Sequence, residues 1–240
     1  MLFSRDDVAR YIDNNFEAAW EMVRPVPLIR IDFGNNHVIT RTLNGNIATY
    51  VCAGDGQALD VLPGIYAPAE YLAGLYQLRL LANYVDQQGK AQRQARLRAY
   101  HQRQAEAIKN NQPREVFINT AGRSKAAIEG GIRAVLVSSD ALSKEGGAAL
   151  RKRAPVPLAG SKTLGLADKE DVAHWKLLQE DTRLNETARR QRIHEIWTET
   201  RFIRPEQITK RLYKEVLHTD LDDPYLGLAN LLFANYPFDR

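Results

Sequence analysis

Apolar side chains near the N-terminus recur at helical spacing. Val8, Tyr11, Ile12 and Phe16 are three or four residues apart, so they fall on one face of a helix. Ser4 stands ahead of this stretch and acidic residues follow it, an order that is typical of a capped helix start. The pattern therefore predicts an amphipathic helix over residues 5–16.

The next apolar residues alternate with polar ones, as in strands that bury one face. Glycine, asparagine and aspartate interrupt the alternation where hairpin turns need a positive φ. Strands are predicted over residues 28–33, 47–52 and 58–62, with a weaker strand pattern over 37–42, and a helix starts near Pro68. The order helix, strand, weaker strand, strand, strand, helix predicts an α/β fold with an antiparallel hairpin at its end.

The rest of the chain changes character twice. Residues 86–112 are rich in helix formers and poor in apolar residues, so we expect an exposed basic helix. Residues 113–168 hold glycine, proline and serine around two short strand-like runs, and we expect a partly disordered linker there. Residues 169–240 regain apolar stripes at helical spacing, which predicts a helical region. Residues 1–85 form the predicted α/β domain.

Composition and charge add few constraints. The chain has 240 residues and a formal net charge of +4, which is too small to make a general case for nucleic acid. No apolar run approaches the roughly 18 residues that cross a bilayer, so no membrane span is expected. Charged residues follow Met1 at once, without the apolar stretch of a signal peptide. As written, the sequence therefore predicts a cytoplasmic protein.

Residues 46–72 resemble the second half of thioredoxin-like domains. In that family a central strand runs into an Asp-Gly turn, an antiparallel edge strand, a break and a closing helix. Here Asp55-Gly56 stand at the turn and Pro63-Gly64 at the break. Residues 7–16 also look like the helix that approaches the first of these strands in extended members of the family, so the resemblance extends over roughly a third of the chain. It implies a thioredoxin-like domain, followed by the linker and the helical C-terminal region.

Two positions depart from the redox chemistry of that family. Its enzymes hold a Cys-x-x-Cys pair at a helix N-terminus, where the helix dipole lowers a thiol pKa, and a cis-proline beside that pair. Cys52 is the only cysteine of this chain, and Ile47 stands at the proline position. Because Cys52 ends an apolar strand, we expect it to be buried as a small hydrophobic residue. The chain is thus expected to perform no intramolecular dithiol–disulfide cycle.

The resemblance also implies elements that are missing. A thioredoxin-like sheet needs a first strand and an active-site helix ahead of the helix over residues 5–16, and only four residues precede that helix. We expect that Met1 is an internal methionine and that the gene continues upstream. An upstream start would supply an active-site segment and would leave an extracytoplasmic location open.

The basic helix is a candidate binding surface. Over residues 90–109, arginines are interleaved with an aromatic residue, a combination that binds single-stranded nucleic acid through phosphates and stacking. The candidate contacts are Arg93, Arg96, Tyr100 and Arg103. The alternative is that this helix is a solvated face without a ligand.

The sequence lacks the motifs of phosphate-binding proteins, of hydrolases with a nucleophile elbow and of zinc enzymes. No phosphate-binding glycine loop and no nucleophile elbow occurs. His194 lies near Glu186 and Glu199, but not at the His-Glu-x-x-His spacing of zinc enzymes. We therefore expect no catalytic residue, no metal and no cofactor, and we assign the histidines structural or surface roles.

Three functional hypotheses follow from these observations. The leading one is a non-catalytic thioredoxin-like binding or scaffold module whose partner is an unidentified protein. The second is a relative of thiol–disulfide oxidoreductases whose active-site segment lies upstream of Met1. The third is a nucleic-acid-associated protein that uses the basic helix.

Overall fold

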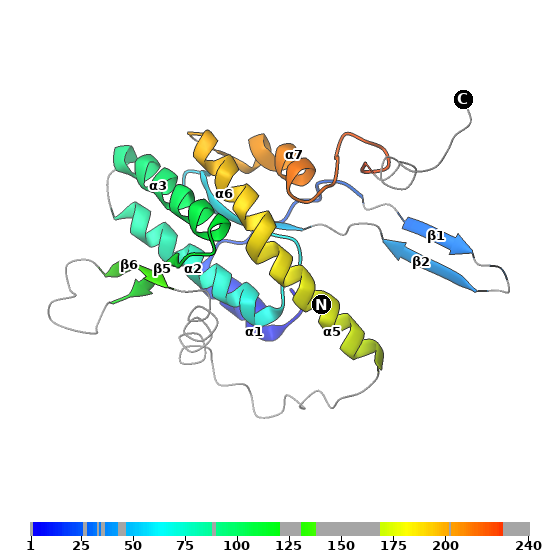
Figure 1. Cartoon of the computed structure of the whole chain (residues 1–240). Coiled ribbons are helices and arrows are strands. Elements are labelled where there is room, and N and C mark those ends of the chain that lie inside the picture. Colours follow the sequence, from blue (N-terminus) through cyan, green and yellow to red (C-terminus); the bar gives the residue numbers. More distant parts are fainter. Residues whose placement is uncertain are drawn as a thin grey trace.

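The first half of the chain follows the predicted order of elements (Figure 1). The computed structural model describes residues 2–25, 28–32, 34, 37–42, 47–87, 90–120, 131–137, 169–201 and 203–227. The first elements are α1 (Asp6–Asn15), β1 (Leu28–Asp32), β2 (Val38–Thr42), β3 (Ala48–Cys52), β4 (Ala58–Pro63) and α2 (Pro68–Asp86). Aspartates occupy the first turn of α1, but its N-cap residue is Arg5 and not Ser4. A mixed α/β architecture is therefore confirmed.

The second half is mostly helical. Its elements are α3 (Lys90–Lys109), β5 (Arg114–Asn119), β6 (Ile132–Val137), α5 (Lys169–Leu184), the short π-helix η2 (Asn185–Arg189), α6 (Arg190–Glu199) and α7 (Pro205–Glu215). Strands β5 and β6 lie within the predicted linker and pair as an antiparallel hairpin. The rest of that linker prediction falls on residues 121–130 and 138–168, which lie outside the described residues.

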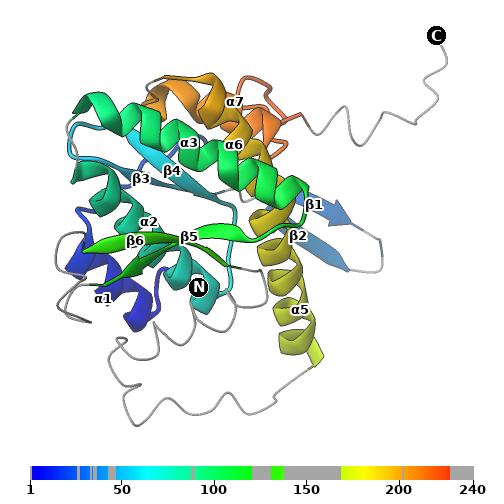
Figure 2. The ribbon, with the colours of Figure 1, turned by 60° about the vertical axis from the view of Figure 1, so that its left-hand side comes forward.

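All strand pairs among the described residues are antiparallel. They form three two-stranded sheets, β1–β2, β3–β4 and β5–β6. The β1–β2 hairpin projects away from the helices in both ribbon views (Figures 1 and 2). The β3–β4 hairpin lies inside the body of the molecule, with a bulge between Val51 and Cys52. The thioredoxin-like assignment remains a prediction, because these pairings do not test it.

The β3–β4 hairpin is covered on both faces. The register shift opposite Val51 and Cys52 interrupts the alternation along β4, so that Ala58 and Val61 share one face. On one face, Val51, Leu59 and Leu62 pack with the apolar side of α2. On the other face, Ala58 and Val61 pack with residues of α6 and α7. Burying apolar surface at about 25 cal/mol per Å² is the main force that holds these layers together.

This packing places parts of the two predicted regions, residues 1–85 and 169–240, in one core. Val61 of β4 belongs to the same buried cluster as Ile193 and Ile196 of α6. The hydroxyl of Tyr50 also lies 3.1 Å from that of Thr209 in α7. The helical C-terminal region is thus a structural layer of the β3–β4 hairpin and not an appended unit.

None of the helices in the described part of the chain combines the length and the apolar character that crossing a bilayer requires.

Candidate functional site

Buried ionisable side chains gather where β4, α3 and α6 meet. Strand β4 contributes Asp60, α3 contributes Tyr100 and His101, and α6 contributes Arg190 and His194. None of these five residues is more than 7% exposed, and we call them the buried polar cluster. A carboxylate in a fully buried strand has no access to water, so Asp60 needs a charged partner in the interior.

Arg190 is that partner. Its guanidinium donates from Nη1 to Asp60 Oδ1 and from Nη2 to Asp60 Oδ2, both at 2.8 Å, and Nη1 also donates to Val61 O at 2.7 Å. The Val61 N–H donates to Asp60 Oδ1 at 2.8 Å, and Tyr100 donates its hydroxyl to Oδ2 at 3.3 Å. Burial lowers the pKa of Arg190, but Asp60, Tyr100, Glu186 and Tyr66 raise it, and together they hold that pKa above its usual value. Both buried charges are therefore fully compensated.

The two histidines form a second, uncharged pair. Their Nδ1 atoms lie 2.8 Å apart, and His101 Nε2 lies 2.9 Å from Leu59 O. Burial lowers the pKa of His101 to about 4. Burial and the nearby charge of Arg190 hold the pKa of His194 well below its usual value. Both rings are therefore neutral near pH 7.

Neutrality determines where the protons lie. A carbonyl oxygen only accepts, so the proton of His101 must be on Nε2, and its Nδ1 must be the acceptor. His194 then donates from Nδ1, which leaves its Nε2 without a proton. The pair is a fixed chain of hydrogen bonds that runs from α6 through α3 to the backbone of β4.

The cluster does not suit a metal ion. Ligand atoms of Asp60, His101 and His194 lie within 4.8 Å of one another, a spacing that a cation can bridge. However, the Arg190 guanidinium already donates to both carboxylate oxygens, and both nitrogens of His101 are engaged. The positive charge that a metal would supply is thus supplied by Arg190.

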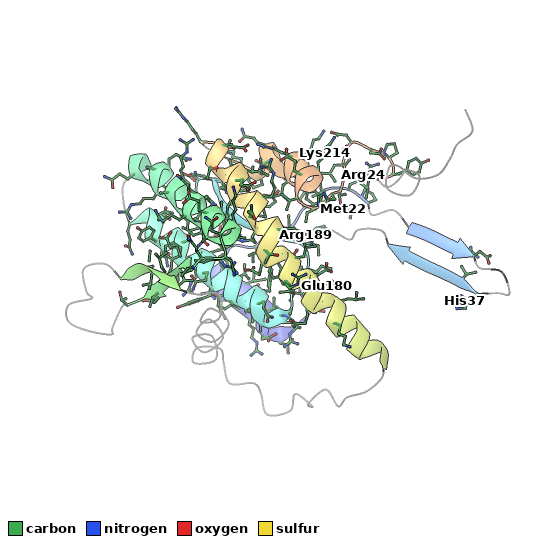
Figure 3. The ribbon with its side chains drawn as sticks, viewed as in Figure 1. Met22, Arg24, His37, Glu180, Arg189 and Lys214 are labelled. Carbon is green, nitrogen blue, oxygen red and sulfur yellow. The ribbon has the colours of Figure 1, made fainter. Side chains whose placement is uncertain are left out.

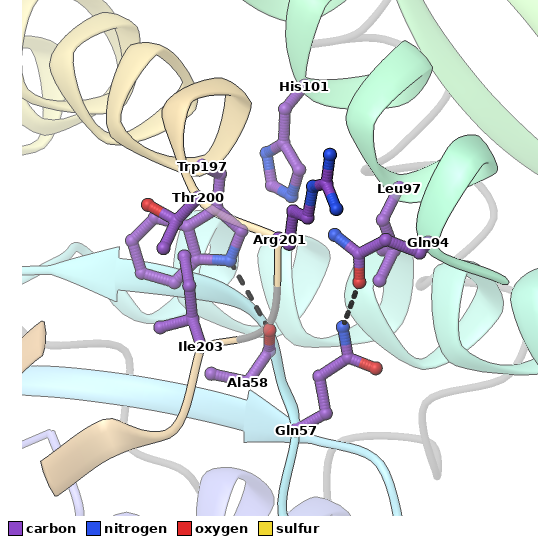
Figure 4. Close-up of a pocket in the computed structure, with 9 residues that line it drawn as sticks. All are labelled: Gln57, Ala58, Gln94, Leu97, His101, Trp197, Thr200, Arg201 and Ile203. Atoms are coloured by element: carbon purple, nitrogen blue, oxygen red, sulfur yellow. Dashed lines mark hydrogen bonds between the residues drawn. The ribbon is translucent and has the colours of Figure 1, made fainter. Parts of the chain in front are cut away.

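The cavity beside the cluster is too small for a substrate. It has a volume of about 10 Å³ and is bordered by His101, Trp197 and Arg201 (Figure 4). That volume accommodates about one water, whereas small-molecule sites usually measure about 300–1,000 Å³. The space beside His101 is therefore no larger than a solvent molecule.

The cluster has a clear structural role along the outer edge of β4. The carbonyls of Leu59 and Val61 accept hydrogen bonds from the cluster, and the carbonyl of Ala58 accepts one from the indole of Trp197 at 3.3 Å (Figure 4). Side chains of α3 and α6 thus satisfy the backbone groups that a neighbouring strand would otherwise satisfy. At this edge of the hairpin, the cluster therefore takes the place of a further strand.

The predicted nucleic-acid contacts Arg93 and Arg96 are engaged within the protein. Arg93 lies 2.7 Å from Asp55 and 2.7 Å from Asp86 in two ion pairs. The guanidinium of Arg96 stacks over the ring of Tyr84, 4.8 Å from its centroid. Neither guanidinium is free to bind a phosphate without giving up these contacts.

Tyr100 and Arg103 also make their contacts within the protein. Tyr100 is only 5% exposed and its ring centroid lies 5.7 Å from that of Phe117, so it cannot stack on a nucleic-acid base. Arg103 makes a two-pronged ion pair with Glu115. The expected exposed basic helix is exposed only on its outer face, because its other face packs on α6 and β5. The structure does not gather the four predicted residues on one accessible surface.

The expectation that Cys52 is buried is wrong. Its side chain is exposed, because it lies at the bulge that ends β3. Partial removal from water raises the pKa of the Cys52 thiol, and the Glu206 carboxylate raises it further. A thiol of this kind is a weak nucleophile near pH 7, since the thiolate is the reactive form.

No protein-family model, no curated protein and no solved structure matches this chain. The thioredoxin-like resemblance therefore rests on residues 7–16 and 46–72 of the sequence, and the geometry of the site is the basis for any statement about function.

The sequence singled out Tyr100 and His194, but it did not reveal that they belong to a buried polar cluster with Asp60, His101 and Arg190. Asp60 carries a weak signal, because it is a charged residue between the apolar pairs of the 58–62 strand. Nothing in the spacing shows that its partner Arg190 comes from 130 residues further along the chain. His101 gives no signal either, since it lies among polar residues of a helix that looks solvated.

Proposed function

We propose that this chain is a non-catalytic module, built on a thioredoxin-like N-terminal part, that binds another protein molecule. The observation that carries this proposal is the exposure of residues 17–23, between α1 and β1. All seven side chains are exposed, with Trp20 at 86% and Met22 at 66%. Tryptophan and methionine are enriched in protein interfaces, where their burial contributes most of the binding energy.

This segment is held at both ends. Phe16 packs against the core, with its ring centroid 6.3 Å from that of Tyr11. Arg24, which is labelled in Figure 3, donates to the carbonyls of Leu221, at 2.7 Å, and of Asp223. Within the described part of the chain, the backbone of residues 17–23 makes no hydrogen bond. A segment that is anchored and unpaired loses less conformational entropy on binding than a free chain does.

The chemistry of the interior supports a non-catalytic role. The Asp60 carboxylate accepts hydrogen bonds from Arg190, and the two histidines are bonded to each other, with His101 also bonded to the carbonyl of Leu59 in β4. The exposed thiol of Cys52 has a raised pKa and no second cysteine to form a disulfide with in the same chain.

Site-specific photo-crosslinking tests the binding role. A photoreactive amino acid is placed at position 20 or, as a control, at position 177, where Leu177 on α5 is 62% exposed. In cells that produce the chain, we expect covalent adducts from position 20 that do not form from position 177. Equal yields from the two positions would contradict the proposal.

A reductase assay tests the absence of redox catalysis. The purified chain should give no insulin reduction above the dithiothreitol background, and Cys52→Ser should behave identically. Turnover that Cys52→Ser abolishes would instead favour the thiol–disulfide oxidoreductase hypothesis.

A further inference from the structure

The outer face of α3 carries an open groove with two arginines in it. The groove has a volume of about 510 Å³ and is lined by Gln94, Ala95, Arg98, Ala99, Gln102 and Arg201. Arg98 and Arg201 are exposed, and neither forms an ion pair within the described residues. By contrast, Arg93 and Arg103 on the same helix are both paired with carboxylates. The groove is therefore a basic surface without its counter-charge.

Residues 17–23, the exposed segment between α1 and β1, carry negative charge, which is opposite to the charge of the groove. Glu17 and Glu21 stand on either side of Trp20 in sequence, and both are exposed. Across the described ranges of the chain, neither glutamate forms an ion pair. One molecule thus displays both an acidic segment with a large aromatic residue and a basic groove.

We propose that residues 17–23 of one copy of this chain bind the groove on α3 of a second copy. This inference rests on the proposed function and names its partner. Each copy carries both surfaces, so two copies related by a two-fold axis make the contact twice, as in most homodimers. Reciprocal contact doubles the area that is buried and leaves no free segment to recruit further copies.

The chemistry of the groove suits this occupant. Ala95 and Ala99 line the same groove as the two arginines, and their small side chains leave room for an indole ring. A guanidinium beside that ring gains a cation–π contact as well as an ion pair with a neighbouring glutamate. Gln94 accepts a hydrogen bond from Gln57 through Oε1, which leaves its amide N–H groups for backbone carbonyls of the segment.

Sedimentation of the purified full chain tests the dimer. The unmodified protein should be a dimer with a dissociation constant in the range of about 1–100 µM, which is usual for small polar interfaces. Trp20→Ala should weaken the dimer by at least about tenfold, because the aromatic anchor is lost. Since Trp20 is exposed, this variant should retain the circular dichroism spectrum of the unmodified protein.

Charge exchange provides the sharper experiment. The double variant Glu17→Lys/Glu21→Lys should be monomeric, and so should Arg98→Glu/Arg201→Glu, because each places like charges in both contacts. A mixture of the two variants should form dimers again, since both contacts of the mixed pair then join opposite charges. Lys109→Glu, on the same helix but outside the groove, is the matched control and should dimerise normally.

Three outcomes would overturn the inference. They are an unmodified chain that stays monomeric at all concentrations, a dimer that ignores the charge reversals, and a mixture of the two variants that stays monomeric. If position 20 crosslinks in cells to a different protein while the purified chain is monomeric, the inference falls and the proposed function stands. If position 20 gives no specific adduct at all, both fall.

Discussion

At the residue scale, the neutral pair His101 and His194 makes the stability of the fold depend on pH. In the unfolded chain a histidine has a pKa near 6.5, whereas burial in the native state lowers the pKa of His101 to about 4. Below pH 6.5 the unfolded state therefore binds protons that the native state does not bind, and this favours unfolding.

The pH dependence can be predicted with its sign. As pH falls from 6.5 toward 4, the free energy of unfolding should decrease by up to about 1.4 kcal/mol per pH unit for each of the two histidines. Urea denaturation at a series of pH values measures this slope. A protein that is equally stable at pH 7 and pH 5 would show that the histidine pair is not buried in its neutral form.

Neighbouring residues and the backbone conformation restrict position 64 to glycine. Gly64 follows β4 with a φ of +73°, and a Cβ at this position would lie 2.9 Å from Asn185 Oδ1 in η2. Gly64→Ala should therefore lower the free energy of unfolding by about 1–3 kcal/mol, through the strained backbone and the close contact. Gly54→Ala is the control, because no atom lies within 4 Å of its Cβ, and it should stay within about 0.5 kcal/mol of the unmodified protein. Equal melting temperatures for the two variants would contradict this reading.

At the element scale, the Asp60–Arg190 ion pair joins α6 to β4. Its two side chains are 0% and 9% exposed, so breaking the pair leaves a charge in the interior. Arg190→Met should cost about 3–5 kcal/mol in the free energy of unfolding, because Asp60 then has no counter-charge. The double variant Asp60→Asn/Arg190→Met should recover most of this loss, since asparagine is neutral and still accepts from the Val61 N–H.

Denaturant unfolding of the single and double variants measures this coupling. Arg192→Met removes an arginine from the same helix whose side chain is 36% exposed, and it should cost no more than about 1 kcal/mol. A double variant as unstable as Arg190→Met alone would show that packing, and not charge, is what Arg190 contributes.

The elements themselves were largely predictable. Alternation in residues 28–33, 47–52 and 58–62, and helical spacing in residues 5–16, are local patterns, and the structure has β1, β3, β4 and α1 there. The interpretation of α3 was incomplete, because its apolar residues are few and Tyr100, His101 and Gln104 are polar or amphipathic residues that nonetheless face the core. A search for apolar residues at helical spacing cannot reveal a buried helix face whose side chains are polar and hydrogen-bonded in the interior.

At the scale of the whole molecule, the C-terminal helices complete the core of the N-terminal hairpin. Ala58 and Val61 pack with residues of α6 and α7, and the outer edge of β4 is closed by α3 and α6. A chain truncated after residue 168 should therefore fail to unfold cooperatively, since it would expose both this apolar face and the buried charge of Asp60. Calorimetry of residues 1–168 measures this, and a sharp transition like that of the full chain would contradict it.

The sequence by itself determined the order of the N-terminal elements, because turn residues and hydrophobic periods act over a few neighbouring positions. It also determined that this chain cannot close an internal disulfide, since Cys52 has no second cysteine to pair with. Only the tertiary structure decided that Cys52 is exposed, that Tyr100 is buried, and that Asp60 meets Arg190 from 130 residues away. Burial and charge pairing depend on which distant segments pack together, and local patterns in the sequence do not show which segments these are.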